Sequence, residues 1–210
     1  MPALISSESV QHFDHAIDIP ADVLNILRAN ASRANVILPH AEKLLGIQAF
    51  KPRIVSNDQL WLVYTKPGTS SIKFVLSCTE GPLGKYPIFI VPTVPISELT
   101  PELLGDSMEA FCHALLRKPG FKKNRVFSVF SLDLVAEAFA EAWERLAEIN
   151  REEELYYDAI FTLCSRDTFI DAPAPDDVVM RPAAGRDAQK IAVLCEEFAA
   201  TSVCLLLPPS

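Results

Sequence analysis

Three β-rich runs between Trp61 and Val91 constrain the fold of this chain more than any other feature. They cover residues 61–65, 72–79 and 86–91, and stretches rich in proline and glycine separate them. β-branched and aromatic residues between such breaks are typical of an antiparallel meander. Residues 74–76 and 88–91 are continuously apolar, as in strands that are buried on both faces. The sequence therefore predicts a central sheet with helices against both faces.

Helical spacing of apolar side chains precedes the meander. Residues 20–38 show this spacing, and Pro39 is expected to end the helix. Residues 40–45 are predicted to form a second short helix with Gly46 as its C-cap. Two helices are thus expected before the first strand of the meander, and residues 1–19 are expected to be a loosely ordered N-terminal arm.

Further helices and strands follow the meander. Thr100 and Pro101 suit the N-cap and the first position of a helix. Another helix is expected to begin at Ser131 or Asp133, with its apolar stripe facing inward. Residues 125–131 and 156–165 have the composition of strands. These elements make the chain an α/β protein with a mixed, mostly antiparallel central sheet flanked by helices.

Composition and charge narrow the function classes. Half of the 210 residues are hydrophobic and the mean hydropathy is +0.20, which allows a sizeable core. The net charge of −8 argues against a nucleic-acid or anionic-membrane surface, since both need concentrated Lys and Arg. No apolar run reaches the roughly 20 residues of a membrane span, and the N-terminus lacks the features of a secretion signal. Most of the five scattered cysteines have apolar neighbours, which favours buried, reduced thiols, so the predicted compartment is the cytoplasm.

One basic cluster lies between the expected helices, around Pro119 and Gly120. It is a solvated loop in one interpretation and a phosphate contact in the other. Its members are Arg117, Lys118, Lys122, Lys123 and Arg125.

The order of elements in residues 20–166 is helix, helix, three strands, helix, strand, helix, strand. That order resembles the GNAT superfamily of acyl-CoA-dependent N-acyltransferases. Residues 179–198 resemble the opening of a second GNAT domain, with a strand ending in Arg181-Pro182, an acidic N-cap at Asp187 and an amphipathic first helix. The whole is similar to fungal tandem GNAT-like proteins.

The resemblance implies a domain organisation in four parts. Residues 20–170 form a degenerate GNAT-like domain after the arm 1–19. Residues 171–177, with Pro173 and Pro175, form a linker. Residues 178–210 are expected to hold the first strand and helix of a second, truncated GNAT-like unit. The apolar tail 203–207 is expected to serve as a contact for homo-oligomers.

The resemblance also implies a cofactor, acetyl-CoA or another acyl-CoA. Family members bind the CoA pyrophosphate on backbone N–H groups of a glycine-containing loop between the fourth strand and the next helix. Residues 93–101 correspond to this loop, and Val94, Ser97 and Thr100 are the candidate cofactor-binding residues. Proline at positions 95 and 101 removes two donors, the segment has no glycine, and an acidic side chain at position 98 opposes phosphate. We therefore expect weak CoA binding or none.

Three residues are candidates for catalysis. Glu80, at the end of a central strand, could be the base for an acceptor amine; the alternative is a solvated carboxylate in a Gly/Pro turn. Tyr156 and Tyr157 could act as a general acid toward the leaving thiolate, or could simply pack on the sheet. Cys78 is expected in the core, and the sequence contains no metal-ligand spacing.

Two functions follow from these expectations. The first is an acyl-CoA-dependent N-acyltransferase that acts on a small amine. The alternative is a noncatalytic GNAT-like binding or interaction module with a degraded CoA loop, whose partner is a small molecule or a protein.

Overall fold

The computed structural model describes residues 9–50, 59–81, 84–153, 162, 164, 166–170, 179 and 181–202. The chain divides into two compact units, Met1–Glu153 and Glu154–Ser210. The first unit contains the sheet with the helices packed on it. The second contains one α-helix in its described part, directly after a 3₁₀ turn.

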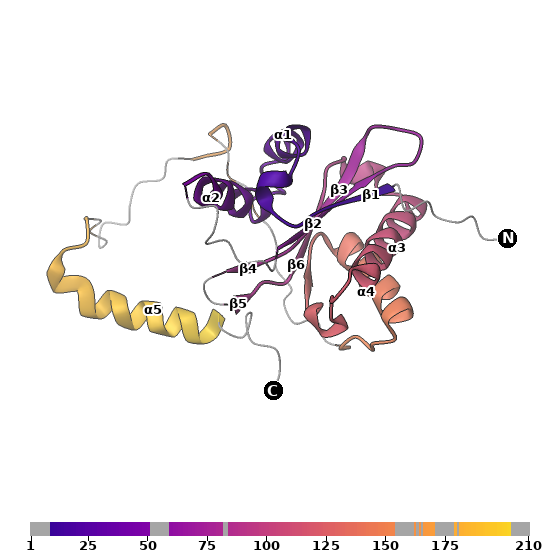
Figure 1. The fold of residues 1–210 in the computed structure, drawn as a ribbon. Helices are drawn as coiled ribbons and strands as arrows, with labels where there is room; N and C mark the ends of the chain where they lie inside the picture. Colours follow the sequence, from indigo (N-terminus) through magenta and orange to yellow (C-terminus); the bar gives the residue numbers. More distant parts are fainter. Residues whose placement is uncertain are drawn as a thin grey trace. The chain divides into compact units, whose positions relative to one another are not determined.

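A five-stranded sheet forms the centre of the first unit (Figure 1). Its strand order is β1-β2-β3-β6-β7. The pairs β1/β2, β2/β3 and β3/β6 are antiparallel, and β7 runs parallel to β6. The predicted meander and the mixed, mostly antiparallel α/β architecture are confirmed. The strands are β1 (Val10–Phe13), β2 (Leu60–Thr65), β3 (Ile72–Cys78), β6 (Ile88–Pro92) and β7 (Val129–Phe130). A separate small hairpin joins β4 (Glu80–Gly81) to β5 (Gly84–Lys85).

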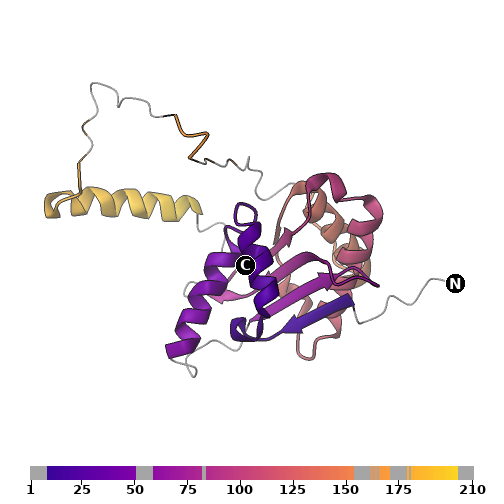
Figure 2. The ribbon, with the colours of Figure 1, turned by 90° about the horizontal axis from the view of Figure 1, so that it is seen from above.

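Helices cover both faces of the sheet, as the apolar runs predict (Figures 1 and 2). Alternate side chains of each strand point to opposite faces, so the sheet contributes to two cores. Trp61, Val63 and Val75 pack toward α1 (Ala21–Ala29) and α2 (Ile37–Phe50). Leu62 and Leu76 pack toward α3 (Pro101–Arg117) and α4 (Asp133–Ala147).

The prediction of a loosely ordered N-terminal arm is wrong for the described residues 9–19. Val10–Phe13 pairs with β2 as an edge strand, with Val10 opposite Tyr64 and Phe13 opposite Trp61. A 3₁₀ turn follows at Ala16–Asp18 and buries Ala16. An edge strand can be short and partly polar. The four residues of β1 have two polar residues at their centre, so the sequence showed no alternation of apolar and polar residues there.

The predicted boundaries of the first two helices are also wrong. α1 ends at Ala29, and α2 starts at Ile37 and continues through both Pro39 and Gly46. Pro39 lies in the first turn of α2, where the backbone N–H has no partner within the helix in any case. Proline there helps to start the helix and does not end it.

The N-terminus of α3 matches the prediction. The Leu103 amide donates to Oγ1 of Thr100 at 3.3 Å, and Pro101 takes the first helical position. The start of α4 does not match, because Leu132 is its N-cap and makes no side-chain cap. Ser131 instead donates from Oγ to the carbonyl of Ile90 at 2.6 Å.

The second unit contains α5 (Ala188–Ser202), which confirms the predicted helix there. Arg181 makes two hydrogen bonds to the Asp187 carboxylate, both 2.7 Å, just before α5 begins. The predicted strand at 156–165 is described only at Thr162 and Cys164, and Tyr156, Tyr157, the linker 171–177 and the tail 203–207 lie outside the described residues. Among the helices that the structure describes, none combines the length and hydropathy that crossing a bilayer requires.

Candidate functional site

In the loop between β6 and α3, residues 93–101, several backbone amides donate hydrogen bonds to carbonyls of the protein itself. The Thr93 amide donates to the Lys73 carbonyl at 2.9 Å. A 3₁₀ turn then spans Ile96–Glu98. The next amides donate to carbonyls within the loop, Glu98 to Pro95, Leu99 to Ile96 and Thr100 to Glu98, at 3.0, 3.1 and 2.9 Å. These donors are therefore occupied by the turn itself.

The three predicted cofactor-binding residues lie in this loop but have different surroundings. Val94 is buried and its carbonyl accepts a hydrogen bond from the Arg33 guanidinium. Ser97 is exposed on the 3₁₀ turn. Thr100 caps α3 with its side chain. Only Ser97 presents a side chain that has no structural role among these contacts.

Two carboxylates make the start of α3 acidic. Glu98 lies 3.8 Å from the Lys73 ammonium. Hydrogen bonds from its own backbone amide and from the Thr100 hydroxyl hold the pKa of Glu102 below its ordinary value. Ionised carboxylates here stabilise the helix N-terminus and repel a phosphate that would approach the same position.

The structure places Glu80 in β4, where it is half-buried and pairs across the hairpin with Lys85. Cys78, two residues earlier, is buried as predicted, and burial raises the pKa of its thiol. A protonated, enclosed thiol is a poor nucleophile. Of the three predicted catalytic residues, Glu80 alone lies within the described structure.

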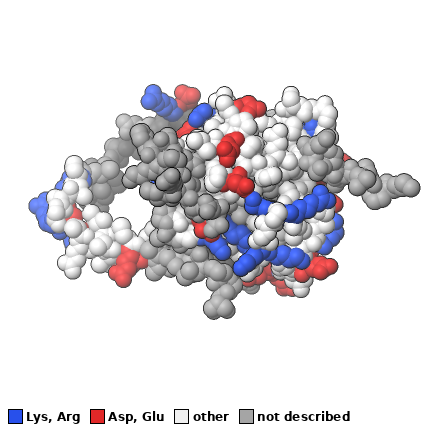
Figure 3. All heavy atoms as spheres, in the orientation of Figure 1, with Lys and Arg blue, Asp and Glu red and all other residues white. Residues whose placement is uncertain are grey.

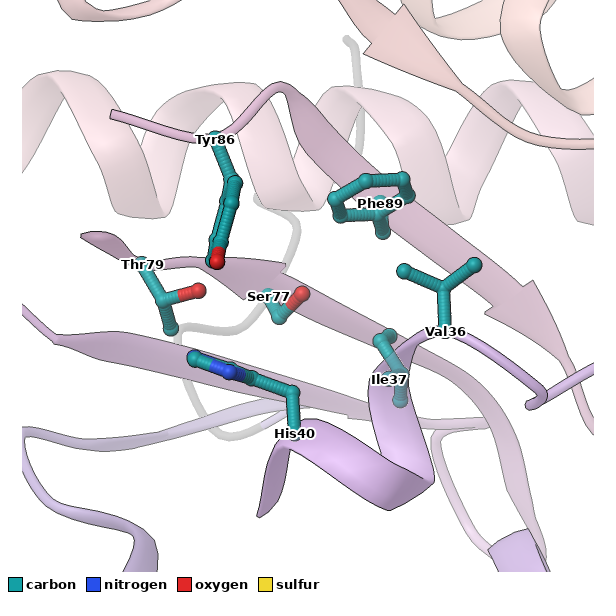
Figure 4. Close-up of a pocket in the computed structure, with 7 residues that line it drawn as sticks. All are labelled: Val36, Ile37, His40, Ser77, Thr79, Tyr86 and Phe89. Carbon is teal, nitrogen blue, oxygen red and sulfur yellow. The ribbon is translucent and has the colours of Figure 1, made fainter. Parts of the chain in front are cut away.

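A pocket of about 260 Å³ opens on the face of the sheet that α1 and α2 cover (Figure 4). It lies between the first turn of α2 and the ends of β3 and β6. Alternation along β3 brings Ser77 and the following Thr79 to this face, and both are almost fully buried, at 2% and 1% exposure. The lining residues are Val36, Ile37, His40, Ser77, Thr79, Tyr86 and Phe89.

Polar groups converge at one end of this pocket. The side chains of His40, Thr79 and Tyr86 meet there, whereas Val36 and Phe89 form the apolar end (Figure 4). Nε2 of His40 is buried and has no hydrogen-bond partner within the described part of the chain. The imidazole ring is held edge-on to Tyr86, with 5.3 Å between ring centroids.

Burial and then the positive charge of Lys43 lower the pKa of His40. The imidazole is therefore neutral at physiological pH. A neutral imidazole with an unpartnered Nε2 can donate or accept one hydrogen bond.

Arg125 holds together the two chain segments that form the polar end of the pocket. Its guanidinium donates to the carbonyls of Thr79 and Tyr86, at 2.8 and 2.9 Å. Gly81 is required next to them, because an added Cβ would overlap the Tyr86 hydroxyl and ring. Hydrogen bonds to a charged donor are stronger than neutral ones, so the two segments that carry the pocket's hydroxyls are held firmly together.

Figure 3 shows Lys and Arg side chains gathered in the region of α3, α4 and the segment between them. Three cations of the predicted basic cluster contact groups of the first unit. Lys118 pairs with Asp14, Lys123 donates to the Ala147 carbonyl at 2.6 Å, and Arg125 holds the pocket. These contacts give Lys118, Lys123 and Arg125 a structural role.

The described residues contain no group of three or more His, Cys, Asp or Glu side chains that could hold a metal ion. The polar groups that line the pocket are one neutral imidazole and three hydroxyl groups. Sequence reasoning missed these residues, since only tertiary packing brings them together. Ser77 and Thr79 were the available signal, as two polar residues at alternate positions directly after the apolar run 74–76.

No protein-family model, curated protein or solved structure matches the chain. We therefore infer the function from the geometry of the loop and the pocket.

Proposed function

We propose that the first unit is a noncatalytic GNAT-like module that binds a small molecule and does not hold CoA through the loop 93–101. The order of its elements supports the likeness. Two helices precede the antiparallel strands β2, β3 and β6, and α3 then leads to β7, which pairs with β6 in parallel.

The observation that carries the proposal is the hydrogen bonding of the loop. A pyrophosphate needs several converging backbone donors. Here the amides of Glu98, Leu99 and Thr100 already donate within the turn, and proline at positions 95 and 101 supplies none. Binding CoA would require these bonds to break while Glu98 and Glu102 oppose the incoming charge.

An N-acyltransferase acting on a small amine is the second candidate. The half-buried Glu80 favours it, because a carboxylate just after a central strand could accept a proton from an amine. Acetyl-CoA would then have to bind by contacts other than those of the loop, and Tyr156 or Tyr157 would have to supply the acid.

Thermal unfolding in the presence of acetyl-CoA separates the two candidates. A working site stabilises the protein by about 2.7 kcal/mol at a hundredfold excess of ligand over its dissociation constant. We expect no more stabilisation than ADP produces at the same ionic strength. A clear shift beyond the ADP control, accompanied by acetyl transfer to an amine, would establish the acyltransferase instead.

A further inference from the structure

We propose that the pocket lined by His40, Thr79 and Tyr86 binds a small uncharged molecule that has one compact ring and one hydroxyl or amide group. The inference rests on the proposed binding function and names the ligand class of that site. Three properties of the pocket support it: its size, the distribution of its polar groups and its lack of charge.

The size fits a ligand with a single ring. The volume is about 260 Å³, just below the range of about 300–1,000 Å³ in which drug-sized molecules bind. Ring faces and edges of His40, Tyr86 and Phe89 and the branched side chains of Val36 and Ile37 form its walls. Aromatic walls of this kind favour a flat, apolar ring.

The polar groups require a hydrogen-bonding substituent at one end of the ligand. Nε2 of His40 is buried without a partner in the described structure, and the hydroxyls of Thr79 and Tyr86 point into the same space (Figure 4). A buried polar atom without a partner is unfavourable. A ligand hydroxyl or amide placed here would provide the missing partner, because it can donate and accept.

The lining contains no Asp, Glu, Lys or Arg side chain. A protonated amine would lose its hydration without gaining a carboxylate, and the positive charge of Lys43 already acts on His40. An anion would find no charged donor, because the Arg125 guanidinium is directed to the carbonyls of Thr79 and Tyr86. The pocket therefore discriminates by charge as well as by size.

Three probes of nearly equal size test this inference on the full chain. Benzyl alcohol is neutral, whereas benzylamine and benzoate carry opposite charges near neutral pH. We expect benzyl alcohol to bind with a dissociation constant on the order of 1 mM, measured by saturation-transfer NMR and by shifts of the His40 imidazole signals. Both charged probes should bind at least about 10-fold more weakly.

Variants locate the site. Tyr86→Phe and Thr79→Val each remove one hydroxyl, and each should weaken benzyl alcohol binding by about 3- to 10-fold. Tyr64→Phe is the matched control, because this buried tyrosine lies on the opposite face of the sheet, and its binding should equal that of the wild type. Val36→Trp, at the exposed rim, should block the pocket without disturbing the core.

The proposal is overturned if benzyl alcohol does not bind, if the three probes bind equally, or if Val36→Trp binds as well as the wild type. Circular dichroism confirms that each variant is folded before binding is scored. If benzyl alcohol does not bind, the outcome of the acetyl-CoA experiment is unaffected. If acetyl-CoA binds and is used for acetyl transfer, the proposal of a noncatalytic module is overturned whatever binds in this pocket.

Discussion

The two ends of strand β6 differ in how they use polar groups. Beyond its C-terminal end, the amides of Glu98, Leu99 and Thr100 bond to carbonyls of their own loop. Before its N-terminal end, Tyr86 contributes a hydroxyl to a pocket in which Nε2 of His40 has no described partner. The backbone amides beyond the C-terminal end are therefore paired within the protein, whereas the polar side chains near the N-terminal end can form hydrogen bonds to a ligand.

This contrast shows why the order of helices and strands alone does not fix the position of a binding site. A recognition surface needs polar groups that are held rigidly but lack partners. In the loop the second condition fails, whereas the pocket meets both conditions because Arg125 holds its hydroxyl-bearing segments. The contrast predicts that loop variants change stability alone, and that pocket variants change ligand binding as well.

The largest effect is expected from Arg125→Leu. This substitution removes two charge-assisted hydrogen bonds to the Thr79 and Tyr86 carbonyls, so the free energy of unfolding should fall by about 2–3 kcal/mol. Urea denaturation measures the loss, and benzyl alcohol binding should disappear with it. Lys122→Leu, at an exposed position of the same segment, should change stability by less than about 0.5 kcal/mol. Equal losses of unfolding free energy in the two variants would show that Arg125 does not stabilise the pocket.

Gly81→Ala should have the next largest effect. The added Cβ overlaps the Tyr86 side chain, which must move away, at a cost of about 1–2 kcal/mol. Gly46→Ala is the control, because nothing lies within 4 Å of the added Cβ inside α2. That variant should gain up to about 1 kcal/mol from helix propensity. A loss of ligand binding in Gly46→Ala, or its retention in Gly81→Ala, would contradict the described packing.

Thr100→Ala tests the loop side of the comparison. Loss of the N-cap to the Leu103 amide should destabilise the protein by about 1 kcal/mol, while benzyl alcohol binding stays at the wild-type value. Ser97→Ala, at an exposed neighbouring position, should be neutral within about 0.5 kcal/mol. Reduced ligand affinity in Thr100→Ala would show that the two ends of β6 are coupled.

The smallest effect concerns pH. The pKa of His40 is lowered in the folded state, first by burial and then by Lys43, while the unfolded value is about 6.5. Between the two values the unfolded chain binds more protons, so stability rises with pH and is lost as the pH falls below about 6.5. In urea denaturation across this range, His40→Gln should show a flatter pH dependence than the wild type. Parallel curves would mean that His40 is not desolvated.

The sequence predicted the parts of the fold where the apolar pattern is dense. The strands β2, β3 and β6 and the Thr100-capped helix were recognisable because continuous apolar runs and turn residues bounded them. β1 was missed because the exposed Gln11 and His12 interrupt its apolar pattern. The path of α2 through Pro39 was missed because a first-turn proline and a helix-ending proline look alike in sequence.

The pocket was less predictable than the fold for a physical reason. His40 lies far from Ser77 and Tyr86 in the chain, and each alone is an ordinary residue of its segment. They come together because the sheet register pairs Ser77 with Phe89 and because α2 packs on the same face of the sheet. Glu80 was recognisable from its position after a strand, but its pairing partner Lys85 depends on the hairpin.

The lengths of the two outermost strands bear on how the protein behaves when concentrated. β1 has four residues and β7 has two, so each border of the described sheet offers a foreign strand only a few backbone groups. Long, flat borders are the usual starting points for intermolecular β-assembly. Deleting residues 9–13 would uncover the six-residue β2, and light scattering should then register more self-association than for the intact chain.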